Sequence, residues 1–496
     1  MSRDQGSGIR GQGIADWLDP QACPRDRPSL DAMSAATRDL HDAIDAHARR
    51  TGIPYLHPDE PTVQLDLLGS KQVIEWQEAK AAFLFASEGC WSELPHLYAR
   101  YGTTATAQLI AKLKSLEHAS AALACDSGMQ ATALAFDALM EPGGHAVLMC
   151  QVYNKTRSYL EWMAARVGGT ITIVDDGDAA ALEAVIVPGT RFVFAETFTN
   201  PLVRAQDLDA LREVMTRARA IAPEIRLILD TTIASPWAFN TPPLRNGVDI
   251  VVASGTKSLG GNDRDMWGYI ATNDSQFANS VMDLMAMRGG ILDWRRAAAV
   301  SAAFDRAGDS HAQRCATASK VAAFLSRHQR VSEVFHPSLP NHPDRHALDS
   351  QYARHGSLLS FRIADADDPS AGSGSPRPFD ELRVVPSEVE GRAESSGEDR
   401  TRHFADVLAT TVIVRYALSF DGLATKVNHH RTVSEYFTAP DQLRRNGFDR
   451  LVRLAIGLED ADDLIAALNW TLHHGDRISA ADVELWQRQR AATLGI

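Results

Sequence analysis

Cysteines are few in this sequence, and they form no recognisable pattern. Its 496 residues hold five, an odd number with no CxxC spacing: Cys23, Cys90, Cys125, Cys150 and Cys315. Disulfide frameworks of secreted domains use even numbers of cysteines, and many zinc sites use CxxC pairs. We therefore expect reduced thiols with structural roles, as in a cytosolic protein, and no catalytic cysteine.

Long hydrophobic runs are missing as well. The first residues, MSRDQGSGIRGQGIADW, contain no apolar stretch of the kind found in secretory signals. No window approaches the ~20 apolar residues that a membrane span requires. The sequence therefore predicts a cytoplasmic protein without membrane contact.

Positive charge is also in short supply. The chain has 50 lysines and arginines against 63 aspartates and glutamates, a formal net charge of −13. Proteins that bind nucleic acids or anionic membranes present basic patches, and no basic stripe offsets this acidic excess. We expect a small-molecule substrate and no nucleic-acid partner.

Short apolar segments alternate with helical patterns through the middle of the chain. They are HAVLMC, TITIVD, RFVFAE, IRLILD, DIVVAS and GYIAT, all rich in strand-forming residues. This alternation predicts an α/β fold with a mostly parallel sheet, whose ligands bind at the carboxyl ends of the strands. Five polar residues follow these segments and could converge on one crevice: Tyr153, Glu196, Asn200, Asp230 and Lys257.

Asp230 and Lys257 are the most informative pair. A buried lysine at a strand end can condense with an aldehyde cofactor, because burial lowers its pKa and makes the amine nucleophilic. An aspartate on the neighbouring strand can keep the pyridine nitrogen of such a cofactor protonated. Taken singly, Lys257 is better explained as a solvated turn residue and Asp230 as a helix cap. Together they indicate pyridoxal 5'-phosphate (PLP).

Residues 96–140 show two helical patterns separated by a turn of small residues, Ser127-Gly128-Met129. Glycine lets backbone N–H groups approach a phosphate at the positive end of a helix, and a serine hydroxyl adds a donor. An ordinary helix start is the alternative interpretation.

The segment SGTKSLGG around Lys257 resembles the cofactor-lysine signature of the Cys/Met-metabolism family of PLP-dependent enzymes. This family includes cystathionine synthases and lyases, methionine γ-lyase and O-acylhomoserine sulfhydrylases. The resemblance extends, with gaps, from about Tyr98 to Leu472. It implies the aspartate-aminotransferase-like PLP fold (fold type I), with a mostly parallel seven-stranded sheet, a smaller C-terminal α/β domain, and active sites shared within a homodimer or homotetramer.

The resemblance also implies roles for individual residues. Lys257, Tyr153 and Asp230 would be catalytic, and Tyr153 would stack on the cofactor ring. In the YARYG segment, Tyr98 and Arg100 would reach the cofactor phosphate of the neighbouring subunit. The full implied cofactor-binding set is Tyr98, Arg100, Ser127, Gly128, Met129, Tyr153, Asn200, Asp230, Ser254, Thr256 and Lys257.

Substrate binding is implied by the closing segment LVRLAIGLEDADDLIAALNWTL, which resembles the end of the family's chains. Arg453 would clamp the substrate α-carboxylate, with Ser419 beside it. The alternative for Arg453 is a strand residue paired with Glu459 or Asp460.

The sequence also departs from the family's motifs at several positions. Thr103-Thr104-Ala105 replaces the usual NPT, and Asn154-Lys155 follows Tyr153 where the family has two small residues. Asn262-Asp263-Arg264 follows the lysine loop, and FDGLATKVNHHRT follows Ser419. Phe198 replaces a proline. We expect the bulkier, charged Asn154-Lys155 pair to alter substrate choice.

The sequence suggests three regions: an N-terminal extension and arm over 1–95, a large PLP-binding domain over 96–295, and a C-terminal domain over 296–496. Residues 366–400 are rich in Gly, Ser, Pro and charge, and part of them resembles the translated product of a dispersed bacterial repeat. We predict a disordered insert there, followed by a helix starting near His403; a lid is the alternative. His336, His342 and His346 lie close in sequence, but a surface turn explains their spacing, and we expect no metal site.

These patterns predict a PLP-dependent transferase or carbon–sulfur lyase. The leading hypothesis is β/γ-elimination or γ-replacement on a sulfur-containing amino acid or O-acylhomoserine, a transsulfuration reaction like that of cystathionine γ-synthase or a sulfhydrylase. One alternative is elimination of the methionine γ-lyase or cystathionine lyase type. Others are a transaminase, or a catalytically silent assembly subunit, against which the retention of Lys257 and Asp230 argues. Substrate, leaving group and oligomer size stay open.

Overall fold

The computed structural model describes residues 33–51, 70–85, 90, 94, 97–260, 263–364, 393–411 and 413–495. The chain forms two compact units. The smaller unit ends at Thr104 and excludes residues 87–90, which are assigned to the larger unit. Its described elements are α2 (Ala35–Thr51), α3 (Ser70–Phe85) and the short 3-10 helix η3 (Ala99–Tyr101). Within this unit the Arg100 guanidinium lies 5.5 Å from the ring centres of both Tyr98 and Tyr101.

The larger unit contains a seven-stranded sheet in its described residues. The strands are β1 (Ala121–Cys125), β2 (His145–Met149), β3 (Thr170–Val174), β4 (Thr190–Glu196), β5 (Arg226–Asp230), β6 (Ile250–Ala253) and β7 (Gly268–Thr272). Their order is β1-β7-β6-β5-β4-β2-β3. The pairs from β3 to β6 are parallel, and β7 is antiparallel to both of its neighbours. The predicted mostly parallel sheet is confirmed.

The strand β1 does not follow from the sequence pattern. Residues 96–140 suggested two helical segments separated by a turn, but Ala121–Cys125 pairs with β7 along its whole length. Its residues, AALAC, lack the β-branched side chains that usually mark a strand. Pairing with β7 and complete burial decide its conformation, because strand preference depends on context.

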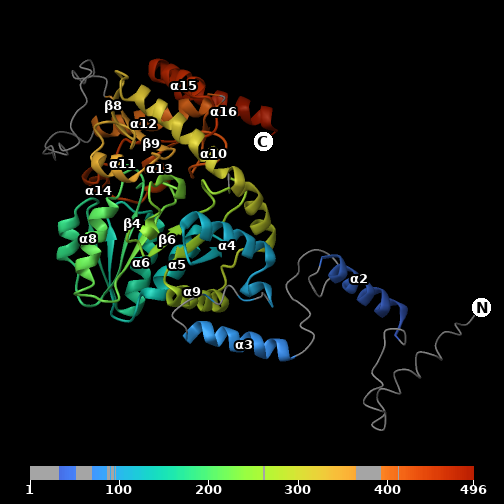
Figure 1. Ribbon diagram of the computed structural model, residues 1–496. Coiled ribbons are helices and arrows are strands. Elements are labelled where there is room, and N and C mark those ends of the chain that lie inside the picture. The colour runs from blue at the N-terminus through green and yellow to red at the C-terminus, as the bar shows by residue number, and fades with distance from the viewer. Residues whose placement is uncertain are drawn as a thin grey trace, which may run out of the picture. The chain divides into compact units, whose positions relative to one another are not determined.

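Helices surround this sheet (Figure 1), and their positions explain why its strands are apolar on both faces. They are α4 (Thr104–Glu117), α5 (Gly128–Leu139), α6 (Asn154–Val167), α7 (Ala179–Ala184), α8 (Leu208–Ala218) and α9 (Ser275–Arg288), with 3-10 turns η4 (Pro236–Ala238) and η5 (Pro243–Arg245). α5 packs against β6 and β7, and α9 packs against β1. The N-terminal end of α5 is thereby set beside the carboxyl end of β6.

A long helix, α10 (Trp294–Leu325), leads to a second sheet with order β10-β11-β12-β9-β8. These strands are β8 (Val331–Phe335), β9 (Leu358–Ile363), β10 (Arg415–Tyr416), β11 (Lys426–His429) and β12 (Val452–Ala455). The accompanying helices are α11 (Arg345–Gln351), α12 (Ala393–Thr410), α13 (His430–Ser434), α14 (Pro440–Arg445), α15 (Ala461–His474) and α16 (Ala480–Leu494), with η6 (Gly475–Arg477). A separate hydrophobic cluster, including Phe361, Leu408 and Leu468, fills this part.

The helix predicted to start near His403 begins ten residues earlier, at Ala393. The end of the segment 366–400, for which the sequence predicts disorder, is therefore helical, and residues 366–392 lie outside the described residues. Arg400 anchors this helix, since its guanidinium binds the Asp476 carboxylate at 2.7 Å and the carbonyl of Ala364 at 2.6 Å. These long-range contacts are not visible in the local composition.

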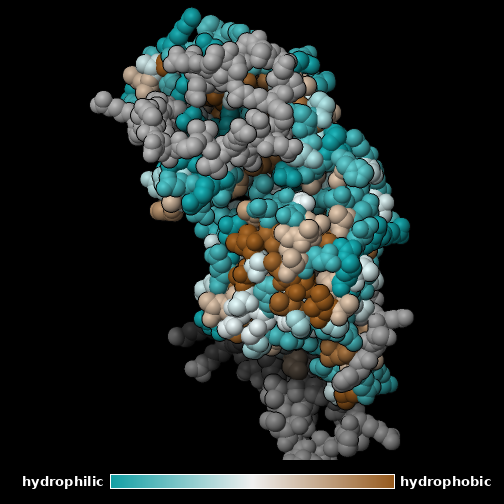
Figure 2. Space-filling model, turned by 90° about the vertical axis from the view of Figure 1, so that its left-hand side faces the viewer, coloured by the Kyte–Doolittle hydropathy of each residue, from teal (hydrophilic) through white to brown (hydrophobic). Residues whose placement is uncertain are grey.

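Within the described parts of the chain, every helix is too short or too polar to cross a bilayer. On the surface shown in Figure 2, hydrophobic residues gather near the middle of the face, with hydrophilic residues around them. Apolar areas of this kind are typical of surfaces that contact another protein.

Candidate cofactor and substrate site

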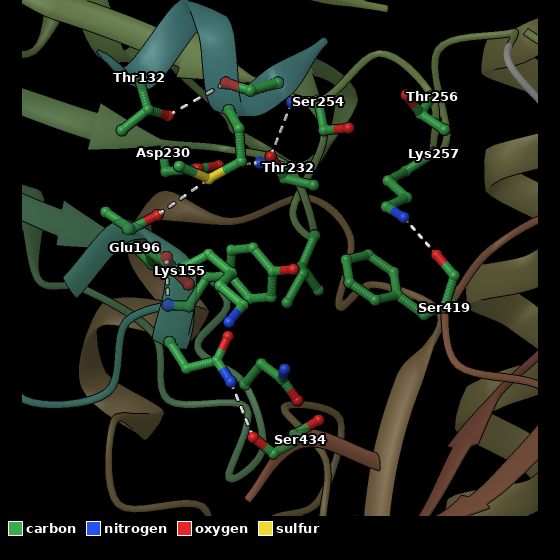
Figure 3. Close-up of a pocket in the computed structure, with 18 of the residues that line it drawn as sticks. Thr132, Lys155, Glu196, Asp230, Thr232, Ser254, Thr256, Lys257, Ser419 and Ser434 are labelled. Carbon is green, nitrogen blue, oxygen red and sulfur yellow. Dashed lines mark hydrogen bonds between the residues drawn. The ribbon is translucent and has the colours of Figure 1, made fainter. Parts of the chain in front are cut away.

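A cavity of about 650 Å³ lies where the carboxyl ends of the parallel strands meet segments of the C-terminal sheet region. Figure 3 shows Glu196, Asp230 and Lys257 around it; the first two end strands β4 and β5, and Lys257 follows β6. Among its other lining residues are ten with an implied role or an unusual identity: Ser127, Gly128, Met129, Tyr153, Lys155, Asn200, Ser254, Thr256, Ser419 and Arg453. Residues far apart in sequence therefore converge, as the strand-end argument predicts.

Lys257 stands in the turn after β6 and points toward Ser419 (Figure 3), whose hydroxyl accepts a hydrogen bond from its Nζ atom. The Nζ atom is 4.8 Å from the centre of the Phe420 ring. Burial is the largest cause that lowers the pKa of this amine. A lower pKa leaves more of the lysine neutral, as nucleophilic attack on an aldehyde requires.

Asp230 and Glu196 end neighbouring strands and stand opposite each other in the β4–β5 register. Burial raises the pKa of Asp230 to about 6, although hydrogen bonds from Thr232 lower it. Burial and then the charge of Asp230 raise the pKa of Glu196 well above its usual value, and the Glu196 carboxylate accepts a hydrogen bond from the backbone N–H of Tyr153 at 2.7 Å. No lysine or arginine of the described residues is among the groups that shift either pKa.

This carboxyl pair provides a test of whether the cavity fits PLP. Two buried carboxyl groups without a cation beside them favour a positively charged ligand group. A protonated pyridine nitrogen is such a group, so the Asp230 end of the cavity fits the ring of the cofactor.

The other end of the cavity fits a phosphate. Ser127 caps α5 by accepting a hydrogen bond from the backbone N–H of Gln130 at 3.2 Å, and its own hydroxyl donates to Asp126 at 3.0 Å. A β-carbon on Gly128 would overlap Ser254, so only glycine permits this close approach of the helix start to β6. The N-terminal end of the 12-residue helix α5 and the nearby Ser254 complete an arrangement suited to an anion, whereas the Thr256 hydroxyl donates to the carbonyl of Trp267 at 3.1 Å.

Arg453 lines the cavity from strand β12. Its guanidinium donates to the side-chain oxygen of Asn200 at 3.2 Å and to the carbonyl of Leu418 at 3.0 Å. Burial lowers its pKa to about 10, so the group stays charged at neutral pH. A buried charge held in this orientation and facing a cavity suits a carboxylate ligand.

The alternative partners of Arg453 are engaged elsewhere. The Glu459 carboxylate accepts hydrogen bonds from the backbone and the hydroxyl of Thr425, both at 2.7 Å. Asp460 caps α15. The interpretation of Arg453 as a strand residue paired with either of them is therefore wrong, because neither carboxylate binds it.

Tyr153 lies at the start of α6 and is 46% exposed toward the cavity. Burial of its remaining surface and the charge of Glu196 raise the pKa of the phenol, which is therefore protonated at neutral pH. Asn154 and Lys155 follow it and line the same cavity. The Asn154 side chain donates to the carbonyl of Ser434 at 2.7 Å, which ties α6 to α13.

Tyr98 and Arg100 are not among the residues that line the cavity. The resemblance assigns them to the site of a neighbouring subunit, and that assignment stays a prediction. Sequence reasoning also missed several lining residues: Thr132, Thr232, Ile233, Met266, Leu418, Phe420, Val433 and Ser434. Only Thr232 had a usable signal, because it follows Asp230 by two positions at the strand end.

The histidines and cysteines have partners or positions of a structural kind. His336 contacts the Ser338 hydroxyl at 2.7 Å, and His342 contacts the carbonyl of Val203 at 3.1 Å. In the described residues, no group of three or more His, Cys, Asp and Glu side chains could hold a metal ion. The four described cysteines are free thiols.

Comparisons with known proteins agree with this geometry. The model of the family described as Cys/Met metabolism PLP-dependent enzyme matches residues 76–376. The cystathionine gamma-synthase of Mycobacterium tuberculosis is 30% identical over 382 residues, covering 76% of this chain and 86% of that protein. The chloroplastic cystathionine gamma-synthase 1 of Arabidopsis thaliana is 29% identical over 371 residues, covering 74% of this chain, which spans only 58% of the plant protein.

The likeness extends to an enzyme of another name and to a solved structure. The L-methionine gamma-lyase of Fusobacterium nucleatum is 26% identical over 410 residues, covering 81% of this chain and 93% of that protein. The crystal structure of metB from Corynebacterium glutamicum superposes with a TM-score of 0.65 at 26% identity, covering 79% of this chain and 92% of that chain. The fold is therefore the one that PLP enzymes of this family adopt.

Proposed function

Because this chain belongs to the Cys/Met metabolism family of PLP-dependent enzymes, we propose that it performs β/γ-elimination or γ-replacement on a sulfur-containing amino acid or O-acylhomoserine. The observation that carries this proposal is the placement of Lys257, Asp230 and Arg453 around one cavity, where a cofactor amine, a ring-nitrogen partner and a carboxylate clamp would be needed. PLP is the cofactor of the family, and its attachment to Lys257 is part of the proposal.

The cavity offers a position for each part of PLP. We assign the phosphate to Ser127, Gly128 and Met129 at the start of α5, together with Ser254 and Thr256. Asp230 would pair with the ring nitrogen, Tyr153 would stack on the face of the ring, and Asn200 would contact the ring hydroxyl. When bound, the cofactor supplies an electron sink for negative charge that develops at the substrate α-carbon.

The chain's own groups would then bind the substrate and move protons. Arg453 holds the α-carboxylate, while Asn200 fixes the plane of the guanidinium. The Nζ atom of Lys257 removes the proton from the α-carbon, and in a γ-reaction a second proton from the β-carbon. Ser419 orients this amine through the hydrogen bond between them. The protonated phenol of Tyr153 can donate its proton to the leaving group.

Among the candidate substrates, Lys155 favours those that bring a second anionic group into the cavity. Its side chain is exposed and lines the cavity, and it is not among the residues assigned to PLP or to the α-carboxylate. An ammonium group there would attract a second anionic group, such as the succinyl carboxylate of a homoserine ester or the carboxylate of an incoming amino-acid thiol. Methionine carries no such group, so Lys155 does not favour elimination of the methionine γ-lyase type. Cystathionine carries a second carboxylate, so elimination of the cystathionine lyase type is the second candidate.

A homodimer or homotetramer is part of the same proposal. Tyr98 and Arg100 lie outside the cavity lining, and a basic residue at its phosphate end is lacking among the described lining residues. The Arg100 guanidinium of a second copy would supply this charge, as the resemblance implies. Sedimentation and cofactor binding of Arg100→Ala test the idea: weakened PLP binding without dissociation supports it, and unchanged binding contradicts it.

The decisive test uses the purified protein and PLP. We expect a visible absorption band from the lysine-bound cofactor, and we expect Lys257→Ala to lack it while remaining folded. Titration with O-acetylhomoserine, O-succinylhomoserine, cystathionine and methionine, with an assay for 2-oxo acid, separates the reactions. A band that responds to one substrate without 2-oxo acid indicates replacement when a thiol is supplied. A folded protein that forms no band contradicts the proposed function and favours a silent subunit.

A further inference from the structure

Two segments whose sequences depart from the family's motifs lie against each other in the structure. One follows the cofactor-lysine loop and carries Asp263, and the other follows Ser419 and carries Lys426. The Nζ atom of Lys426 donates to the Asp263 carboxylate and to the main-chain carbonyl of Asp421. This ion pair joins the loop of Lys257 to strand β11 of the second sheet.

The Asp263–Lys426 pair is not an ordinary solvated surface pair. The side chain of Lys426 is only 9% exposed, whereas that of Asp263 is 50% exposed. A buried ammonium group requires acceptors that replace its water, and here they come from two different loops. Breaking either contact would leave the lysine charge poorly compensated.

The backbone of both loops is shaped for this contact. Asp263 has φ +65° and Asp421 has φ +58°, a left-handed conformation that non-glycine residues adopt rarely and aspartate tolerates better than most. Gly422 has φ +112°, and a β-carbon on it would overlap the Asp263 carboxylate. The carboxylate therefore lies directly against the second loop, at a position where only glycine leaves room.

The same two loops meet a second time at the cavity, through the hydrogen bond from Lys257 to Ser419. The second loop is itself anchored: Arg314 of α10 donates to the carbonyl of Gly422 at 2.9 Å, and Ser357 donates to the Asp421 carboxylate at 2.6 Å. The position of the Lys257 loop relative to Ser419 thus depends on contacts with a fixed neighbour.

We propose that Asp263 and Lys426 form a positioning clasp, which holds the two loops together and so sets where the Lys257 amine stands beside Ser419. The clasp rests on the proposed role of Lys257 as the cofactor lysine. Neither of its members lines the cavity, so both act on the reaction through Lys257 and not by contact with substrate or cofactor.

The clasp also has an electrostatic effect on the pKa of Lys257, which distinguishes it from a purely structural contact. Apart from burial, the charged groups that shift the pKa of Lys257 are Asp421, which raises it, Lys426 and Arg453, which lower it, and Asp263, which raises it. Removing the cation of the clasp should therefore raise the pKa of Lys257, and removing its anion should lower it. A loss of packing alone would not produce opposite shifts.

The test measures the capture of PLP by Lys257 in the apoprotein. Capture is stopped with borohydride at successive times, and modified Lys257 is counted by mass spectrometry across a range of pH. Because condensation requires the neutral amine, the pH midpoint of the capture rate follows the lysine pKa. We expect Lys426→Met to move this midpoint up, and Asp263→Asn to move it down, by about half a unit each.

Two further variants complete the design. Lys426→Arg keeps the charge and should restore most of the wild-type midpoint. Lys112→Met is the matched control, because Lys112 likewise donates to one carbonyl, that of Ser301 at 2.8 Å, and to one carboxylate, that of Asp305 at 2.7 Å, away from the cavity lining. Its midpoint should equal that of the wild type.

Opposite shifts with rescue by Lys426→Arg support the clasp. The clasp is overturned if the midpoints of both variants stay within the range of the Lys112→Met control, or if both move in the same direction. A lowered melting temperature with an unchanged midpoint also overturns it. If the wild type captures no PLP at Lys257, the proposed function fails and the clasp fails with it, a result distinct from normal capture without shifts.

Discussion

At the scale of single residues, Arg453 is a buried cation whose orientation in the cavity is fixed by hydrogen bonds. Two hydrogen bonds hold its guanidinium in one plane, and burial strengthens its interaction with any carboxylate that enters. Lysine in its place would keep the charge but lose the planar pair of donors. The distinction between these two side chains therefore tests the clamp more sharply than removal of the charge.

We predict that Arg453→Lys raises KM for the amino-acid substrate about 30-fold, the equivalent of about 2 kcal/mol for a charge-assisted hydrogen bond, with a smaller effect on kcat. Steady-state kinetics on the preferred substrate measure both constants. Arg330→Lys is the control, because Arg330 binds Asp476 at 2.9 Å outside the cavity lining and should leave KM unchanged. An unchanged KM in Arg453→Lys would exclude the carboxylate clamp.

Lys155 leads to a second prediction at this scale. Because its ammonium is exposed, its attraction to an anionic substituent should be worth about 1 kcal/mol and should weaken with salt. Lys155→Met should raise KM for O-succinylhomoserine about fivefold and leave KM for O-acetylhomoserine nearly unchanged. Kinetics at low and high ionic strength check this, with Lys155→Arg as the charge-preserving control. Equal effects on the two esters would contradict the assignment.

At the scale of elements, α4 and β7 meet at a buried carboxyl group. The Tyr269 hydroxyl donates to Glu117, whose other carboxyl oxygen has no hydrogen-bond partner among the described residues. Burial raises the pKa of Glu117 to about 7, against the opposing effect of the Tyr269 hydrogen bond. The joint between this helix and this strand is therefore most stable when the carboxyl group is protonated.

This shift predicts a pH dependence of stability with a definite sign. Between pH 4.5 and about 7 the folded state keeps a proton on Glu117 that the unfolded state has released, so the free energy of unfolding falls as pH rises through this window. The contribution is about 3 kcal/mol at most. We expect Glu117→Gln to show a shallower loss of melting temperature between pH 5 and pH 8 than the wild type.

Glu183→Gln is the control for this measurement. Its hydrogen bond with Arg217 lowers the pKa of the exposed Glu183, so that group is ionised in both states over the same range. The slope of melting temperature against pH should therefore match the wild type. A Glu117→Gln slope equal to that of the wild type would show that the carboxyl group does not bind a proton on folding.

At the scale of the whole molecule, the segment between β9 and α12 connects two points that are already joined. The guanidinium of Arg400 on α12 reaches the carbonyl of Ala364, just beyond β9, and the carboxylate of Asp476 in η6. A long connection between neighbouring points adds little closure cost, about 0.6 kcal/mol per doubling of its length. The C-terminal region should therefore fold with a shorter connection.

We predict that replacing residues 366–390 by a short Gly/Ser linker changes neither activity nor melting temperature appreciably. Extending the deletion through Arg400 should lower the melting temperature by several degrees, since it removes the contacts to Asp476 and Ala364. Thermal melts and steady-state assays of the two deletions compare them directly. Loss of activity in the shorter deletion alone would favour the lid interpretation of the segment.

Much of the large domain could be predicted from the sequence. The five parallel strands carry short apolar runs rich in β-branched residues, so their alternation with helical segments placed Asp230 and Lys257 at one edge of a sheet. Local patterns suffice here because strand conformation and strand burial leave their mark on consecutive residues. The resemblance to the family's motifs then supplied the predictions that Ser127 binds the cofactor and that Arg453 binds the substrate carboxylate.

The rest depended on contacts between residues distant in the chain. The strand character of Ala121–Cys125 comes from β7, the orientation of Arg453 comes from Asn200, and the clasp joins Asp263 to Lys426 across more than 160 positions. Local sequence patterns cannot predict these pairings. Taken alone, Ala121–Cys125 is an alanine-rich segment, Asn200 is a polar residue in a loop, and Asp263 and Lys426 are ordinary charged residues. The sequence by itself determined the five parallel strands and predicted Lys257 as the cofactor lysine; only the tertiary structure decided the order of the strands and how that lysine is held, because long-range packing and burial set its position and its charge.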